Sequence, residues 1–233
     1  EECVGSFQIP RLIATLSAMP HRKHIAQDAY VNGKVLDIGY AEFPNHTSKN
    51  LYGIDIAPRP PVDLPNYVET KQTDLNTQPV PYPDGFFDTV IAGDVIEHVA
   101  NPMFLLCESN RVLQLGGTLI VSTPNPYYYW EFMQNLLVKY QWMKARQLGH
   151  FTTFTRINMR NILERTGFTL EKELGNFFTL IILKWVFHLV RFPFLTYQIT
   201  YVAKKTGIPE HYVLSKPAGM PLQKMQTNLG MNV

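Results

Sequence analysis

The chain has 233 residues, of which 45% are hydrophobic and 17% charged, a balance typical of a globular protein and not of a disordered one. This length is enough for one sizeable α/β domain or two small ones. The formal net charge is only +2, and the chain has no long block of Lys and Arg, so its charge does not indicate nucleic-acid binding.

Strands and helices are predicted to alternate along the chain. After a helix at residues 11–19, a short apolar run that ends in glycine predicts a strand at 34–39. Asn101, followed by Pro102, predicts the start of a helix that runs to about Leu113. A glycine stop ends another predicted helix at 158–167. The remaining strands are predicted at residues 50–57, 66–75, 89–92, 118–124, 168–174 and 197–205.

Alternating strands and helices of this kind predict an α/β fold, with one open, parallel sheet that is covered on both faces. Ligands of such sheets bind at the carboxyl ends of the strands. Acidic residues end or follow four successive predicted strands, namely Asp37, Asp55, Asp74 and Asp94. A lone Asp is more often a helix cap or turn former, but four at one sheet edge favour a binding site.

The motifs around these residues resemble a known family. The ordered set is "VLDIG", "YGIDI", "TDLN", "PYPDGFFDTVIAGDVIEHVANP" and "ESNRVLQLGGTLIVSTPN". It is similar to the class I S-adenosylmethionine-dependent methyltransferases, and most of all to the group acting on small molecules, quinones and sugars. The resemblance is close over residues 34–125, where 81–125 is the most specific part, and looser to residue 205.

This resemblance implies a Rossmann-like three-layer sandwich with a mostly parallel seven-stranded sheet, whose last strand is antiparallel. The methyltransferase domain would span residues 1–206, and an irregular tail would follow at 207–233. S-adenosylmethionine would be the cofactor, with Asp55 on the ribose hydroxyls and Asp74 on the adenine amino group. The cofactor-binding residues that the resemblance implies are Asp37, Gly39, Tyr40, Asp55, Ile56, Asp74, Leu75, Gly93 and Asp94.

The loop after the first strand departs from the family pattern. A Gly-x-Gly turn is usual there, whereas this chain has Gly39, Tyr40, Ala41 and Glu42. In one interpretation, Tyr40 and Ala41 occupy the loop without blocking the cofactor. In the other, the loop is degenerate and the chain is a non-catalytic, Rossmann-like binding protein. The other acidic positions are intact, which favours the first interpretation.

Histidines are the candidate catalytic residues, because an unperturbed imidazole can remove a proton from an acceptor near neutral pH. His98 follows the fourth predicted strand, and His150 lies in the segment after the fifth, which contributes to the acceptor pocket in the family. Packing roles remain open for both. His46 is a weaker third candidate. No spacing typical of metal ligands is visible, so we expect a metal-independent enzyme.

The expected reaction is O-methylation of a sugar or other small hydroxylated acceptor, and the alternative acceptor is a quinone-like lipid methylated at carbon or oxygen. The run "NPYYYW" at 125–130 resembles the Asn-Pro-Pro-Tyr motif of amino-directed methyltransferases. It follows the fifth strand and not the fourth, so that reaction is rejected. Tyr127 to Trp130 would form a pocket wall or pack in the core.

The strongly apolar stretch at 177–194 is too interrupted to cross a membrane. Lys184, His188 and Arg191 share one helical face there, which predicts a lid-like helical insertion or, alternatively, peripheral membrane contact through 177–191. The two cysteines form no disulfide framework and no signal peptide is recognisable, so a cytoplasmic location is expected.

Overall fold

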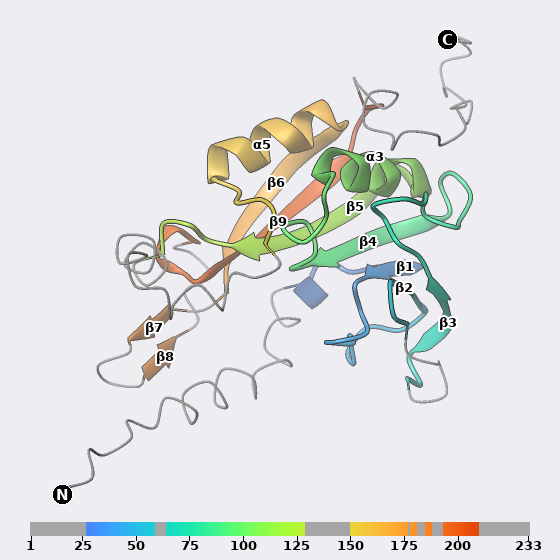
Figure 1. The fold of residues 1–233 in the computed structure, drawn as a ribbon, viewed down its shortest axis with the longest axis horizontal. Helices are drawn as coiled ribbons and strands as arrows, with labels where there is room; N and C mark the ends of the chain where they lie inside the picture. Colours follow the sequence, from blue (N-terminus) through green and yellow to red (C-terminus); the bar gives the residue numbers. More distant parts are fainter. Residues whose placement is uncertain are drawn as a thin grey trace, which may run out of the picture.

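The computed structural model describes residues 27–58, 64–128, 150–176, 178–180, 185–187 and 193–209. Its main feature is a seven-stranded sheet in the order β3-β2-β1-β4-β5-β9-β6 (Figure 1). The strands are β1 (Val35–Ile38), β2 (Leu51–Asp55), β3 (Tyr67–Gln72), β4 (Phe87–Gly93), β5 (Leu113–Pro124), β6 (Phe168–Gly175) and β9 (Gln198–Lys205). The helix expected at 11–19 and nearly all of the tail expected at 207–233 lie outside the described residues.

The strand directions confirm the mostly parallel sheet. β1 pairs in parallel with β2 and β4, β2 with β3, and β4 with β5. The last strand, β9, is antiparallel to both β5 and β6. All seven strands predicted for this sheet are present, and the fold class is the one that the sequence predicted.

Apolar side chains alternate between the two faces of the central strands, because successive residues of a strand point to opposite sides. In β4, Val90 and Ala92 belong to the larger core cluster, and Ile91 between them belongs to the smaller one. β1 does the same with Leu36 and Val35. Because both faces are buried, these strands are nearly continuous apolar runs in the sequence, which explains why they were recognisable.

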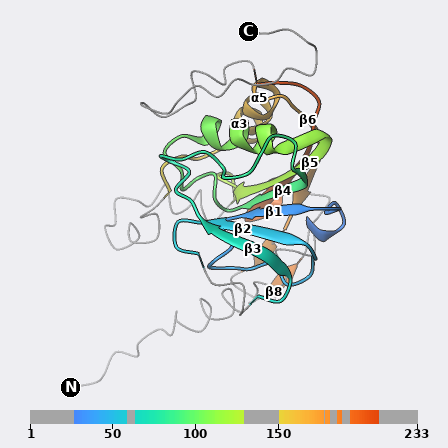
Figure 2. The ribbon, with the colours of Figure 1, turned by 90° about the vertical axis from the view of Figure 1, so that its right-hand side faces the viewer.

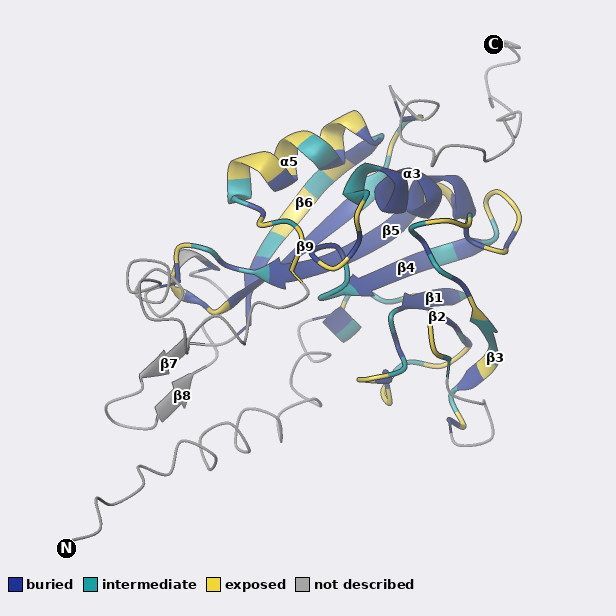
Figure 3. Cartoon of the chain, viewed as in Figure 1, coloured by how far each residue is buried: buried dark blue, intermediate teal, exposed yellow. Residues whose placement is uncertain are grey.

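The helices α3 (Pro102–Val112) and α5 (Arg156–Arg165) lie on the same side of the sheet (Figures 1 and 2). As predicted, the Asn101 side chain caps α3, accepting a hydrogen bond from a backbone amide of the first turn. Met159 and Leu163, four residues apart, place the inner face of α5 in the larger core cluster. The outer face of α5 is exposed (Figure 3).

The helix expected within 177–194 is wrong for the part that the structure describes. β7 (Phe178–Leu180) and β8 (Trp185–Phe187) form an antiparallel two-stranded sheet, followed by a 3₁₀ turn at Pro193–Leu195. Aromatic and β-branched residues dominate these short segments and favour strands. The three basic residues that suggested a helical face lie outside the described residues, and peripheral membrane contact stays a prediction. Within the described residues, no helix is both long and apolar enough to span a bilayer.

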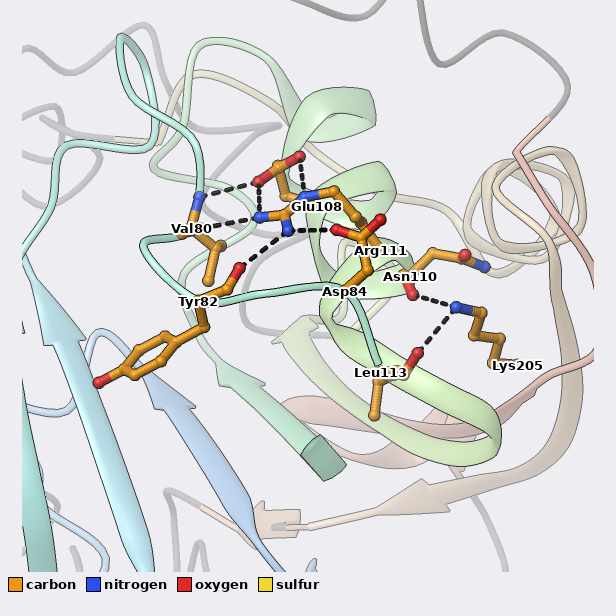
Figure 4. Close-up of polar contacts among 8 residues, drawn as sticks. All are labelled: Val80, Tyr82, Asp84, Glu108, Asn110, Arg111, Leu113 and Lys205. Carbon is orange, nitrogen blue, oxygen red and sulfur yellow. Dashed lines mark hydrogen bonds and ion pairs between the residues drawn. The ribbon is translucent and has the colours of Figure 1, made fainter. Parts of the chain in front are cut away.

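A buried ion pair lies near the amino ends of β4 and β5, away from the carboxyl ends where the site is predicted (Figure 4). The Arg111 guanidinium, 4% exposed, donates to both carboxylate oxygens of the fully buried Glu108 at 2.9 and 2.7 Å. It also donates at 2.8 Å to the carbonyls of Val80 and Tyr82 and to the Asp84 carboxylate. The connection between β3 and β4 is thereby held against the end of α3.

Candidate active site

The four predicted aspartates lie side by side at the carboxyl ends of four neighbouring strands. The strand order places Asp74 after β3, Asp55 at the end of β2, Asp37 in β1 and Asp94 after β4. Backbone hydrogen bonds continue between the chain segments beyond the strand ends, such as that from the Thr73 amide to the Asp55 carbonyl at 2.9 Å. An elongated ligand that lies across these ends would meet the four carboxylates in this order.

A cavity of about 240 Å³ opens at the ends of β1, β4 and β5. Six of the predicted residues line it: Asp37, Gly39, Gly93, Asp94, His98 and His150. The other five, Tyr40, Asp55, Ile56, Asp74 and Leu75, are not part of its wall. Four carboxylates line the cavity, and within the described part of its lining there is no Lys or Arg. The cavity is therefore suited to a cationic ligand.

Asp37 is 5% exposed and lies at the centre of this edge. Burial is the main reason that its pKa is raised to about 7, and the nearby charge of Asp55 acts in the same direction. The hydroxyl of Tyr67 donates to the Asp37 carboxylate and itself accepts from the amide of Asn45 at 2.9 Å. Tyr67 and Asn45 could not be recognised from the sequence, because neither belongs to a motif and both reach Asp37 only through the fold.

The structure shows how the loop accommodates Tyr40. Its ring is 1% exposed, belongs to the smaller core cluster and lies 5.0 Å, centroid to centroid, from the ring of Tyr67. It also covers Gly53 of β2, where a Cβ atom would lie only 2.6 Å from a ring carbon. The Tyr40 side chain therefore lies in the core, and a contact of this loop residue with the cofactor stays a prediction. Because Gly53 has no side chain, the Tyr40 ring can pack over β2 and does not occupy the cavity.

Gly39, in contrast, is required where it stands. Its φ angle of 74° is in the left-handed region, which disfavours any side chain. A Cβ atom at this position would lie 2.4 Å from Cγ2 of Val95. The Gly39 amide donates to the Ile54 carbonyl at 2.8 Å, which continues the pairing of β1 with β2 into the loop. This glycine therefore forms the tight turn between the sheet edge and the cavity.

Asp55 links the loop to the end of β2. Its two carboxylate oxygens accept from the amides of Ala41 and Ala57 at 3.1 and 3.0 Å. The carboxylate is only partly buried, and Ile56 beside it is 62% exposed. A carboxylate can accept from two hydroxyl groups, and the contacts of Asp55 with a ribose and of Ile56 with its base stay predictions.

Asp74 has the role of a turn former. Its carboxylate accepts from the amide and side chain of Asn76 at 2.9 and 3.0 Å and from the Thr77 hydroxyl at 3.2 Å. Leu75 is 7% exposed and belongs to the larger core cluster. The structure thus accounts for both residues locally, and their contact with an adenine ring stays a prediction.

Asp94 is held in an uncommon conformation beside Gly93. Its φ angle is 55°, and its amide donates to the Ser122 carbonyl at 3.1 Å. Its carboxylate accepts from the Ser122 hydroxyl at 3.2 Å and from the Gln198 side-chain amide. Left-handed non-glycine residues occur preferentially at functional sites, where surrounding contacts stabilise them. Ser122 and Gln198 were not identified from the sequence, because Gln198 reaches the site only through the antiparallel strand β9.

The two candidate catalytic histidines lie together. The rings of His98 and His150 are 4.7 Å apart, centroid to centroid, and nearly perpendicular. Burial, followed by the charge of neighbouring His98, lowers the pKa of His150, while Asp94 acts in the opposite direction. Glu97, 1% exposed, lines the same cavity next to His98. His46 is exposed and does not line the cavity.

The aromatic run at 125–130 does not line this cavity in its described part. Asn125 is buried and donates to the Thr196 carbonyl at 2.8 Å, which ties the end of β5 to the start of β9. Tyr128 is 3% exposed, whereas Tyr127 is 63% exposed. Residues 129 and 130 lie outside the described residues. Tyr128 therefore has the packing role that was the alternative.

Comparisons with known proteins agree with this geometry. A family model described as a methyltransferase domain matches residues 11–173. The chain belongs to this methyltransferase family. A relative from Mycolicibacterium smegmatis, described as an S-adenosylmethionine-dependent methyltransferase, is 30% identical over 102 residues, which is 44% of this chain and 36% of the relative. The name of this relative gives S-adenosylmethionine as its methyl donor, and the donor of the methyltransferase domain in this chain is the same.

Solved structures share the fold of this methyltransferase. An S-adenosylmethionine-dependent methyltransferase from Thermotoga maritima superposes with a TM-score of 0.60 at 15% identity, covering 84% of this chain and 96% of that chain. A second, from Aquifex aeolicus, superposes with a TM-score of 0.52 at 13% identity, covering 86% and 100%. At this identity the likeness concerns the fold.

The residues of the cavity fit the donor. S-adenosylmethionine carries a positive sulfonium and an ammonium group at its methionine end, and the cavity at the ends of β1 and β4 is lined by acidic groups. Asp37 and Asp94 would face that end, and Asp55, one strand further along the edge, would hold the ribose. The loop that raised doubt leaves this space free, because Tyr40 is in the core.

The affinity for the donor is expected to rise with pH and to level off above about 7, the pKa of Asp37. Below that pH the Asp37 carboxyl is protonated and neutral, and above it the carboxylate attracts the cationic donor. The limit is about tenfold per pH unit. Tyr67 stays a neutral hydrogen-bond donor over this range, because burial raises its pKa above the ordinary value. Calorimetric titration at constant ionic strength measures the profile.

The matched control for this pH profile is Asp37→Asn, which removes the titrating group and keeps a side chain of the same shape. Its affinity should be lower than that of the natural chain above pH 7 and nearly independent of pH. A natural chain whose donor affinity is flat or falls between about pH 5 and 7 would contradict the assignment of Asp37 to the methionine end.

Proposed function

We propose that this methyltransferase transfers the methyl group to an oxygen atom of a small hydroxylated acceptor, such as a sugar. The observation that carries the proposal is the pair of histidines, His98 and His150, in the wall of the donor cavity. A hydroxyl group is a weak nucleophile until it loses its proton, and imidazole is the side chain whose ordinary pKa suits that task near neutral pH.

The strand order gives the site a direction. A donor laid along the edge from Asp74 to Asp37 has its methionine end at β1 and β4. His98 and His150 line the same cavity, so an acceptor bound beside them would lie close to the methyl group. When bound, the donor supplies an electrophilic methyl group on a positively charged sulfur.

The chain's own residues would then position the acceptor and move one proton. Asp37 and Asp94 hold the cationic end of the donor, which fixes the line of approach. An imidazole of the pair would accept the proton that the acceptor hydroxyl loses as its oxygen bonds to the methyl group, while the bond between that methyl group and the donor sulfur breaks and S-adenosylhomocysteine leaves. The pair is held in place independently of any ligand, because the amides of Phe151 and Thr152 donate to the Glu97 carbonyl at 2.8 and 3.3 Å.

A quinone-like acceptor is the second candidate, and two aromatic side chains favour it. Phe43 and Tyr197 line the cavity and remain 36% and 40% exposed. An aromatic face can stack on the ring of a hydroquinone or phenol, and it can also pack on the apolar face of a sugar. Both acceptors present a hydroxyl group, so the proton transfer would be the same.

The test is methyl transfer from isotopically labelled donor to a panel of sugars and glycosides, hydroquinones, and amines, with the products identified by mass spectrometry. Label in a methyl ether supports the proposal, and the reactive class chooses between the two acceptors. The matched control is the same acceptor with its hydroxyl blocked as a methyl ether, which should stay unlabelled. Label found only on nitrogen, or donor binding without transfer to any class, would contradict it.

A further inference from the structure

Three side chains in the cavity wall combine the atoms that bind transition metals. One ligand atom each of Glu97, His98 and His150 lies within 4.8 Å of the other two. We propose that these residues form a site for a divalent transition-metal ion of the zinc type. The metal site itself is independent of the acceptor's identity, whereas its role in binding the acceptor rests on the proposed function.

The fold brings these ligands together before any ion binds. Glu97 and His98 follow β4, and His150 is more than fifty residues further along the chain. The backbone amide of Phe151 donates to the Glu97 carbonyl at 2.8 Å. Because His150 directly precedes Phe151, this hydrogen bond holds His150 close to Glu97 and His98. A site that is assembled by the backbone needs only side-chain rotation to close on an ion.

The donor atoms decide which ions fit. Two imidazole nitrogens and one carboxylate oxygen suit zinc, iron(II), cobalt(II) or nickel(II), whereas calcium and magnesium prefer oxygen ligands alone. Ligand atoms around a tetrahedral zinc ion lie about 3.3 Å apart, and the three ligand atoms here lie within 4.8 Å of one another, so any movement needed to close the site on an ion is small. His98 and His150 are exposed enough for their rings to make that movement.

The surroundings also favour a cation. Glu97 is 1% exposed, and Asp37, Glu42 and Asp94 add further carboxylates to the cavity lining. Within the described residues, the lining offers no Lys or Arg to compete for them. Three protein ligands leave at least one coordination position open, which is the pattern of a catalytic rather than a structural ion. That position would take the hydroxyl oxygen of the acceptor.

This inference replaces the metal independence expected from the sequence, and it changes the role of the histidines. As ligands they would hold the ion, and the ion would make the coordinated hydroxyl more acidic. The proton would leave to water or to a carboxylate of the cavity, and the chain would need no free imidazole base. A chelator would abolish methyl transfer if the histidines hold a catalytic ion and would leave it unchanged if they act as free bases, so the two roles can be separated.

The experiment is a titration of the chelator-treated full chain with Co²⁺, followed by visible absorption, with Zn²⁺ as the displacing ion. We expect one equivalent of Co²⁺ with ligand-field bands, and binding weakened by more than about 10-fold in His150→Asn and in Glu97→Gln. His46→Gln, a histidine outside the cavity, is the matched control and should bind as the natural chain does. Thermal melting shows that each variant is folded.

Unchanged Co²⁺ affinity in both cavity variants would overturn the inference, as would no binding by the natural chain. Methyl transfer at full rate in excess chelator would also overturn a catalytic ion, while leaving the proposed function intact. Conversely, a metal bound at these ligands in a chain that methylates no hydroxyl group would support the site and refute the proposed function. The two claims therefore fail separately.

Discussion

Replacing Arg111 with methionine is expected to lower the free energy of unfolding by about 3–5 kcal/mol, because it leaves a charge buried without its partner. Glu108 is fully buried, and the Arg111 guanidinium donates to both of its carboxylate oxygens. The same substitution removes the donors to the carbonyls of Val80 and Tyr82, which lie in the connection between β3 and β4. Urea denaturation measures the loss.

The controls for this prediction separate the buried pair from charge in general. Arg165→Met removes an exposed arginine from α5 and should change stability by less than about 0.5 kcal/mol. In a double-mutant cycle, Glu108→Gln combined with Arg111→Met should cost less than the sum of the two single substitutions. Additive losses would contradict a coupled pair. Donor affinity should stay unchanged, because the pair lies away from the carboxyl ends of the strands.

The strands were predictable because the physics that forms them is visible in the sequence. A central parallel strand is buried on both faces, so β1 and β4 are apolar runs with few interruptions. The segments that form β7 and β8 are equally apolar but only three residues long. A short apolar run does not distinguish a helix from a strand. The helix was predicted from the spacing of three basic residues, and that spacing does not determine the structure of the apolar residues in β7 and β8.

The candidate site was predictable only where its residues follow the strand ends. Asp37, Asp55 and Asp94 were found because a parallel sheet collects such residues at one edge. The direction of the Tyr40 side chain could not be predicted, since it depends on a glycine in the neighbouring strand, Gly53. Gln198 could not be found at all, because it reaches Asp94 across about a hundred residues of sequence.

The cluster of Glu97, His98 and His150 shows the same limit at the site of the proposed chemistry. The sequence offers "EH" after a strand and a single His far away, and neither spacing is that of a metal motif. What joins them is a backbone hydrogen bond to the Glu97 carbonyl, which no side-chain pattern reports. Residue types can be listed from a sequence, but the distances between them come from the fold.

Replacing Asp55 with alanine is expected to weaken binding of S-adenosylmethionine by about 100-fold, or about 2.7 kcal/mol. Hydrogen bonds to a charged group are worth about 1.5–3 kcal/mol each, and a carboxylate at the end of β2 can accept two from a ribose. The carboxylate also accepts from the amides of Ala41 and Ala57, so part of the loss would come from a loosened loop. Calorimetry with S-adenosylhomocysteine measures the change without turnover.

A ligand that lacks one ribose hydroxyl separates the two contributions. The natural chain should bind the 2′-deoxyribose analogue of S-adenosylhomocysteine about 10-fold more weakly than the parent ligand, because one hydrogen bond to the carboxylate is missing. The Asp55→Ala chain should bind both ligands equally, since it has no carboxylate to lose. Glu164→Gln, an exposed acid on α5, is the control and should discriminate as the natural chain does. Equal discrimination by the natural and Asp55→Ala chains would show that Asp55 supports the loop and does not contact the ribose.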